Sequence, residues 1–190
     1  MDSLYPKTKW FNVIHRPESK AVKPKIQLFC FPFAGTSPYM FNIRWAKSLP
    51  LSCQVIGVAY PGRGVRIEET SFTSVTKLVD NLLRDTREWF SKSRNLPFFF
   101  YGHSYGAACA YEMARRLQLE HLALPKHLIC SGHLPMHFNP FLPCIGRLPD
   151  DELQEEMLKR YGSPIITDPK IKKIALPPLR ADIIAVEQRK

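Results

Sequence analysis

The sequence predicts an α/β fold in which a mainly parallel sheet is covered by helices on both faces. Short apolar runs of strand length alternate with segments of helical periodicity between residues 26 and 131. The runs are apolar at nearly every position rather than at every second one, as expected for strands that are buried on both faces. A chain of 190 residues with 45% hydrophobic and 23% charged residues is also long enough to bury one well-packed domain.

Four segments are predicted to form the strands of this sheet. In chain order they are residues 26–31, 54–59, 98–101 and 127–130, which are rich in the aromatic and branched side chains that strands favour. The residues before the first strand are rich in proline and lysine. We therefore expect a basic N-terminal extension over residues 1–25 and a single domain over residues 26–190.

Helices are predicted between and after these strands. Residues 75–90 carry apolar side chains at i, i+3 and i+4 spacing, which places them on one buried stripe. The segment after Ser104 is rich in alanine, so its helix can pack close to the sheet. Residues 149–162 have proline at the start, acids in the first turn, bases in the last turn and glycine at the end, which is the pattern of a self-contained helix.

Residues 135–176 are interpreted as a lid region outside the alternation of strands and helices. Leu153 and Met157 share one face of the helix at residues 149–162, so this helix either covers an apolar pocket or lies on the surface. Prolines in the segment that follows predict an irregular tail. These prolines are Pro164, Pro169, Pro177 and Pro178.

The candidate nucleophile is Ser104, in the sequence Gly102-His103-Ser104-Tyr105-Gly106. An aromatic strand comes before it and a small-residue helix follows, which is the strand–turn–helix setting in which G-x-S-x-G forms a nucleophile elbow. The turn is so sharp that only glycine clears the neighbouring backbone on either side of the serine. The Ser104 hydroxyl is then exposed at the carboxyl edge of the sheet and at a helix N-terminus, where negative charge is favoured. A glycine-rich turn without chemistry is the alternative.

Acyl transfer by a serine also requires hydrogen-bond donors for the oxyanion that develops on the substrate. The backbone N–H of Tyr105, directly after the nucleophile, is one candidate donor. The loop over residues 31–38, after the first predicted strand, is expected to supply the other donor through Ala34 or Phe33. Without Ser104, this loop would be read as an ordinary turn rich in glycine and proline.

Composition and charge exclude several classes of function. Residues 1–25 and 169–190 each carry four of the ten net positive charges, and no basic stripe with interleaved aromatics lies between them, which argues against nucleic-acid binding. No apolar run reaches the length of about 18 residues that a membrane span needs, and the N-terminus lacks the apolar core of a signal peptide. Five cysteines without C-x-x-C spacing indicate neither a disulfide framework nor a zinc site. We therefore expect no metal and a reducing, cytosolic compartment.

The chain resembles the type II thioesterases, and within them the group of medium-chain S-acyl fatty acid synthase thioesterases (oleoyl-ACP hydrolases). The resemblance rests on short motifs whose order and spacing make it specific. These motifs are Leu28–Gly35, Tyr60–Arg66, Gly102–Ala107, Ser131–Gly132 and Pro177–Asp182. Two departures are Tyr105, where the animal enzymes have phenylalanine, and Gly64, where an acidic residue is common.

This resemblance implies an α/β-hydrolase fold and an enzyme that releases medium-chain fatty acids from a carrier protein. The acyl group would be held on the phosphopantetheine arm of the acyl carrier protein domain of fatty acid synthase. No metal and no bound cofactor are implied. The acyl chain would lie beneath lid helices, in agreement with Leu153 and Met157, and an acidic carrier protein would suit a basic chain.

The resemblance also implies a triad in the order Ser, Asp or Glu, His, with the acid and the base both beyond Asp182. The chain has eight residues after Asp182 and no histidine after His137. We therefore expect a C-terminally truncated form that lacks the last strands, the acid and the base. His133 and His137 follow the fourth predicted strand and are the candidate substitute bases, with packing in the loop or lid as the alternative role.

Three functional hypotheses stay open on the sequence alone. The first is a thioester hydrolase that uses Ser104 as its nucleophile. The second is a catalytically inactive, truncated form that binds acyl chains or a carrier protein. The third is a carboxylesterase or lipase on the same fold, because G-x-S-x-G does not distinguish oxygen esters from thioesters.

Overall fold

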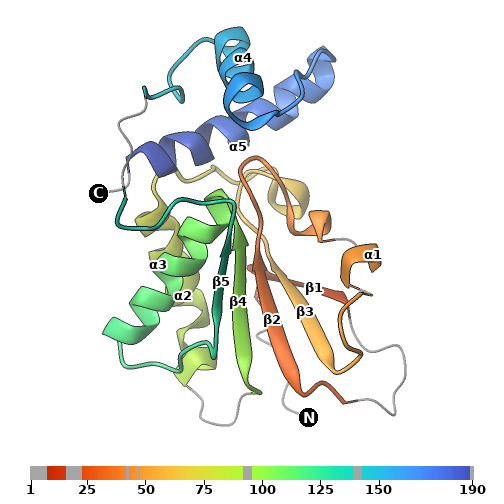
Figure 1. Ribbon diagram of the computed structural model, residues 1–190, viewed down its shortest axis with the longest axis vertical. Coiled ribbons are helices and arrows are strands. Elements are labelled where there is room, and N and C mark those ends of the chain that lie inside the picture. Colours follow the sequence, from red (N-terminus) through yellow and green to blue (C-terminus); the bar gives the residue numbers. More distant parts are fainter. Residues whose placement is uncertain are drawn as a thin grey trace.

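A computed structural model describes residues 8–15, 23–41, 43–46, 48–91, 96–138 and 143–188. It shows a five-stranded sheet with helices on both faces (Figure 1). The strands are β1 Phe11–His15, β2 Ile26–Phe31, β3 Cys53–Val58, β4 Phe98–His103 and β5 Leu128–Ser131. Their order is β1-β3-β2-β4-β5, and all neighbours are parallel except β1 and β3. The predicted α/β fold with a mainly parallel sheet is confirmed.

The register between β2 and β4 brings two loops to the same edge of the sheet. Phe31, the last residue of β2, is the register partner of Gly102 near the end of β4. Because the strands are parallel, the loop that follows β2 and the turn that follows β4 leave the sheet side by side. These two segments are the ones in which the sequence places the oxyanion donors and the nucleophile.

The strand β1 lies in the segment that we expected to be an extension, so the sheet begins earlier than residue 26. Trp10, the residue directly before β1, is 2% exposed, and its Nε1 donates to Asp85 Oδ2 at 2.8 Å. Arg66, in the short helix η2 Gly64–Arg66, stacks with its guanidinium carbon 4.1 Å from the centre of the Trp10 ring. An edge strand needs fewer apolar residues than a central one, which is why composition alone did not reveal it. Residues 1–7 and 16–22 of the expected extension lie outside the described residues.

The main core lies between the sheet and two helices, α2 Val75–Ser91 and α3 Tyr105–Leu119. Both helices confirm the prediction from periodicity. The fully buried Phe29 of β2 makes edge-to-face contacts with four aromatic rings, at centroid distances from 5.1 to 6.0 Å. The four rings belong to Phe11, Trp89, Phe98 and Phe100. Each such pair contributes about 0.5–1.5 kcal/mol beyond the burial of its area.

The opposite face of the sheet is covered by the 3-10 helix η1 Pro38–Met40 and the short helix α1 Ile43–Ala46. A smaller cluster of buried side chains lies there, formed by Cys30, Phe41, Ala46, Cys53 and Val55. This cover does not extend to β5, where Ile129 is 46% exposed. Helices thus lie on both faces, as predicted, with unequal coverage.

Two helices, α4 Asp150–Tyr161 and α5 Pro169–Glu187, lie above the carboxyl end of the sheet (Figure 1). Leu153 and Met157 of α4 are buried against Leu179 and Ile183 of α5. The helix predicted over residues 149–162 is confirmed, and it packs on a second helix rather than standing alone on the surface. Residues 139–142 of the expected lid lie outside the described residues. Among the described helices, none has the length and apolar character to cross a membrane.

The prediction of an irregular tail is wrong, because α5 continues through Pro177 and Pro178. Asp168 caps the helix by accepting hydrogen bonds from two backbone N–H groups of the first turn, and Pro169 occupies a position where proline is tolerated. The two interior prolines remove two helical hydrogen bonds. Five side chains of α5 are nevertheless buried, and this packing outweighs the loss of the two bonds.

Candidate active site

Ser104 occupies the sharp turn between β4 and α3. Its backbone dihedral angles are φ 53° and ψ −121°, a conformation that residues with a side chain rarely adopt. The Ser104 N–H donates to the carbonyl oxygen of Ser131 on β5 at 2.8 Å, and the Ser104 carbonyl accepts from the N–H of Ala107 at 2.9 Å. Hydrogen bonds on both sides therefore hold the serine in this strained conformation.

Two glycines make the turn sterically possible. A Cβ atom on Gly102 would lie 2.2 Å from the carbonyl oxygen of Gly106. A Cβ atom on Gly106 would lie 2.0 Å from the carbonyl oxygen of Phe31, at the end of β2. Both contacts are with backbone atoms that cannot rotate away. The steric role expected for the two glycines of G-x-S-x-G is thus visible in the structure, and α3 begins directly against the end of β2.

The loop after β2 has a fixed conformation and unused donors. The N–H and the hydroxyl of Thr36 both donate to the carbonyl oxygen of Phe33, at 3.2 and 2.7 Å, and Gly35 has φ +73°. Among the described residues, the N–H groups of Phe33, Ala34 and Tyr105 have no hydrogen-bond acceptor. These are the three residues from which the sequence predicts an oxyanion hole. An oxyanion hole requires donors of this kind that are held in place and not already engaged.

A buried ion pair that the sequence analysis did not assign adjoins this loop. Asp182 of α5 is 0% exposed, and both of its carboxylate oxygens accept from the guanidinium of Arg63. The N–H of Gly35 donates to Asp182 Oδ2 at 2.9 Å. Arg63 and Asp182 belong to two of the motifs that support the family resemblance, but they are 119 positions apart and no local pattern pairs them. The motifs were the only signal that could have suggested a shared site.

Burial and hydrogen bonding act in opposite directions on this ion pair. Burial raises the pKa of Asp182, while hydrogen bonds from Arg63 and from the Gly35 N–H act to lower it. Burial alone would lower the pKa of Arg63, but its interaction with Asp182 outweighs burial and raises that pKa. Arg63 is therefore cationic, and a buried cation requires the counter-ion that Asp182 supplies.

Aromatic and thiol groups surround the ion pair. The rings of Tyr60 and Tyr105 meet edge to face at a centroid distance of 5.5 Å. Burial raises the pKa of both phenols well above the usual value. Burial also raises the pKa of Cys109 to about 12, so this thiol is neutral and unsuited to nucleophilic attack. The space behind the elbow is thus filled by neutral polar groups around one buried ion pair.

No histidine side chain in the described part of the chain hydrogen-bonds to the Ser104 hydroxyl. His103 turns toward β5, where its Nδ1 lies 3.1 Å from Ser131 Oγ, as expected for a residue next to the elbow. His133 Nδ1 lies 2.6 Å from the carbonyl oxygen of the next residue. His137 is exposed and lines a pocket between helices. Among the described residues, neither candidate substitute base therefore hydrogen-bonds to the serine.

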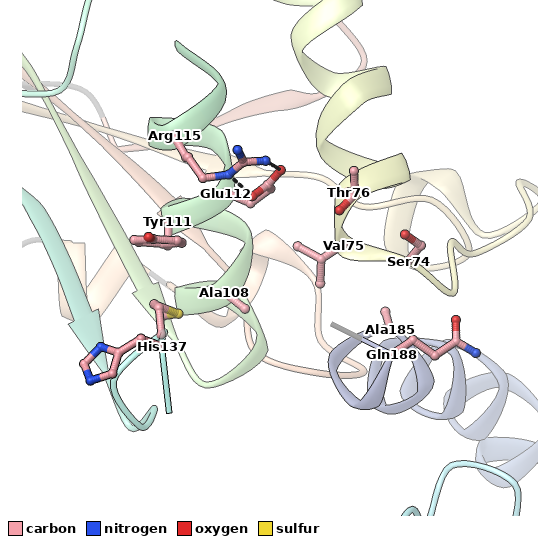
Figure 2. A pocket seen from close by; sticks show the side chains of 11 residues that line it. Ser74, Val75, Thr76, Ala108, Tyr111, Glu112, Arg115, His137, Ala185 and Gln188 are labelled. Carbon is pink, nitrogen blue, oxygen red and sulfur yellow. Dashed lines mark hydrogen bonds and ion pairs between the residues drawn. The ribbon is translucent and has the colours of Figure 1, made fainter. Parts of the chain in front are cut away.

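This pocket has a volume of about 590 Å³ and lies between α2, α3 and α5 (Figure 2). Val75, Ala108 and Ala185 contribute one apolar wall segment from each of the three helices. The ion pair of Arg115 and Glu112, with a distance of 2.8 Å, lines another side. Ala108 is one helical turn beyond the elbow, so the pocket adjoins the helix that follows the nucleophile.

Comparison with solved structures supports the α/β fold described above. The chain is 27% identical to BorB, a type II thioesterase from the borrelidin biosynthetic cluster, with a TM-score of 0.76 over 94% of this chain and 70% of BorB. It is 28% identical to RedJ, a thioesterase from the prodiginine pathway of Streptomyces coelicolor, with a TM-score of 0.75 over 98% of this chain and 70% of RedJ. The predicted α/β-hydrolase type of fold is therefore confirmed.

Sequence comparison gives the same result. The gramicidin S biosynthesis protein GrsT of Aneurinibacillus migulanus is 32% identical over 181 residues, which are 92% of this chain and 65% of GrsT. The medium-chain S-acyl fatty acid synthase thioesterase of Homo sapiens is 30% identical over 152 residues, 80% of this chain and 53% of the human protein. The chain thus spans less than two thirds of the length of either relative. The family model of the thioesterase domain matches residues 26–189. By its motifs, its fold and this match, the chain belongs to the thioesterase family.

Proposed function

We propose that the chain hydrolyses acyl thioesters held on the phosphopantetheine arm of a carrier protein, with Ser104 as the nucleophile. The observation that carries this proposal is the elbow, in which a serine at φ 53° lies between two glycines whose positions no side chain can occupy. Strained backbone of this kind persists mainly where function requires it. Membership of the thioesterase family supports a thioester rather than an oxygen ester as the substrate.

The proposed reaction has two halves. The Ser104 hydroxyl attacks the carbonyl carbon of the thioester, a base accepts its proton, and the carbonyl oxygen becomes an oxyanion that the N–H groups of Tyr105 and of Ala34 or Phe33 stabilise. The C–S bond then breaks, and the pantetheine sulfur leaves with that proton as a thiol. Water next attacks the acyl-serine, which releases the carboxylic acid and restores the hydroxyl. The family resemblance implies a histidine beyond Asp182 as the base; the given sequence has none there, and within it His133 and His137 are the candidates.

The finer substrate that we propose is a medium-chain acyl group on the acyl carrier protein domain of fatty acid synthase, in the cytosol. The human relative supports this choice, since its name states a medium-chain thioesterase of fatty acid synthase. GrsT, named for gramicidin S biosynthesis, supports carrier-bound acyl groups of other pathways. The net charge of +10 favours association with an acidic carrier protein.

Hydrolysis of a decanoyl thioester by the purified chain tests the proposal. Loss of turnover in Ser104→Ala, with turnover retained in Ser91→Ala, is the expected result, because Ser91 is an exposed serine at the far end of α2. A matched decanoyl oxygen ester tests the alternative of a carboxylesterase or lipase. Equal turnover by Ser104→Ala and by the unchanged chain would disprove the role of Ser104.

A second candidate function is binding of acyl chains or carrier protein without turnover. It is favoured by one observation, the lack of any hydrogen bond from a described histidine to the Ser104 hydroxyl. Saturable binding of a fluorescent medium-chain fatty acid, unchanged in Ser104→Ala and without hydrolysis of the thioester, would establish this function in place of catalysis.

A further inference from the structure

We infer that Asp182 is a positioning residue for the oxyanion hole, because its buried carboxylate holds the loop after β2 through the Gly35 N–H. The inference rests on the proposed function, since it assigns the free N–H groups of the loop and of Tyr105 to the oxyanion. It concerns the ion pair with Arg63, which the proposed chemistry does not otherwise use.

The first contact is between Asp182 and the loop. The Gly35 N–H donates to Asp182 Oδ2 at 2.9 Å. This N–H belongs to the peptide that joins Ala34 and Gly35, and a peptide unit is planar, so the bond fixes the orientation of the backbone directly after Ala34. A Cβ atom on Gly35 would also lie 3.0 Å from the Cβ of Leu179, which places the loop backbone against α5. The loop therefore takes its position from the helix that carries Asp182.

A second interaction joins Asp182 to the other half of the hole. The Tyr105 side chain is 2% exposed, and its phenol interacts electrostatically with the same buried carboxylate. The backbone N–H of Tyr105 is the other donor expected to bind the oxyanion. One buried carboxylate thus holds the loop after β2 by a hydrogen bond and acts electrostatically on the residue that begins α3.

The third contact, with Arg63, keeps the arrangement electrically neutral. An unpaired carboxylate close to a developing oxyanion would oppose the reaction by repulsion between like charges. Arg63 donates to both oxygens of Asp182 and is itself held by a bond from its Nε to the carbonyl oxygen of Pro61 at 3.3 Å. Asp182 can therefore hold the loop without adding net negative charge to the site.

Stability alone is a weak explanation for this ion pair. Replacing a buried ion pair by apolar side chains of similar size is often neutral or stabilising, whereas removal of one partner leaves a costly unpaired charge. The informative variant is consequently the double substitution Arg63→Met with Asp182→Leu, which removes both charges together. It also removes the acceptor for the Gly35 N–H.

The test combines thermal unfolding, amide hydrogen exchange and kinetics of decanoyl thioester hydrolysis on the full chain. In the double variant we expect cooperative unfolding to persist, exchange of the Gly35 amide to accelerate by about 100-fold, and kcat to fall by about 10- to 100-fold. The value of KM should change little, because the loop acts on the oxyanion and not on substrate binding. Asp80→Asn, which weakens the ion pair between α2 and Arg116 of α3 at the surface, is the control and should leave both readouts unchanged.

Each outcome decides the inference. Unchanged Gly35 exchange and unchanged kcat in a folded double variant would overturn it. If the unchanged chain shows no turnover, the proposed function fails, while the exchange of Gly35 still decides whether Asp182 holds the loop. If the double variant does not fold, exchange in the unchanged chain decides. There the Gly35 amide must exchange about 100-fold more slowly than the amide of Ala34, which has no acceptor, and similar rates would refute the inference.

Discussion

At the scale of single residues, Ser104 combines two properties that are in conflict. Its side chain supplies the proposed nucleophile, yet its backbone at φ 53° and ψ −121° is one that favours glycine. Such a conformation costs about 1–3 kcal/mol in a residue with a side chain. The rest of the turn must supply that free energy, through the hydrogen bond to Ser131 and the close packing of Gly106 against β2.

Substitution of Ser104 can separate strain from chemistry. Ser104→Gly and Ser104→Ala both remove the hydroxyl, but only glycine relieves the strained backbone. We expect Ser104→Gly to be more stable to urea than Ser104→Ala by about 1 kcal/mol, with turnover abolished in both. The difference between the two unfolding free energies is the measurement, and a more stable alanine variant would show that the backbone at Ser104 is not strained.

At the scale of elements, the sequence predicted the secondary structure of those segments whose own residues carry a clear strand or helix pattern. Residues 28–31 and 98–101 are apolar throughout, and the apolar residues over 75–90 recur at helical spacing, so each segment had a clear signal. The secondary structure of β1 and α5 depends instead on the elements that pack against them. The first completes a sheet edge through β3, and the second contains Pro177 and Pro178 and is held by the side chains that it buries.

The contact between α4 and α5 gives a prediction at the same scale. Leu153 of α4 is 0% exposed in the cluster with α5, whereas Leu158 of the same helix is 45% exposed. We expect Leu153→Ala to lower the free energy of unfolding by about 2–5 kcal/mol, because it leaves a cavity. Leu158→Ala should change it by less than about 0.5 kcal/mol. Urea unfolding followed by circular dichroism measures both, and equal losses would show that α4 is not anchored through Leu153.

At the scale of the whole molecule, the candidate site depends on pairs of residues that are remote in sequence. Ser104 and its glycines were predictable because one short motif contains them all. Arg63 and Asp182 were not paired in advance, because only the folded arrangement of η2 and α5 brings them into contact. A pattern within one segment cannot report a contact that requires the packing of the complete fold.

The response to acid is a further property of the whole molecule. Hydrogen bonds from Arg66 and then Lys9 lower the pKa of Glu69 from 4.5 to about 2, and these contacts link the start of the described chain to η2. The charged form is thus favoured in the folded state, so its stabilising effect is complete above about pH 4.5 and is lost as the pH falls toward about 2. Unfolding free energies of Glu69→Gln should show a weaker decline between about pH 5 and pH 2 than those of the unchanged chain. The adjacent exposed Glu68 provides the control Glu68→Gln, and an equal decline in all three proteins would contradict this assignment.

The hydrogen bond from the Ser104 N–H to Ser131 couples the mobility of the elbow to that of β5. Ser131 ends β5, which is the outermost strand on its side of the described sheet, with Ile129 open to solvent. The backbone that presents the nucleophile is therefore hydrogen-bonded to an edge strand of the described sheet, and not only to its interior. Any segment that packs along the outer edge of β5 is expected to restrict the motion of the Ser104 backbone. A more mobile edge is expected to make that backbone more mobile.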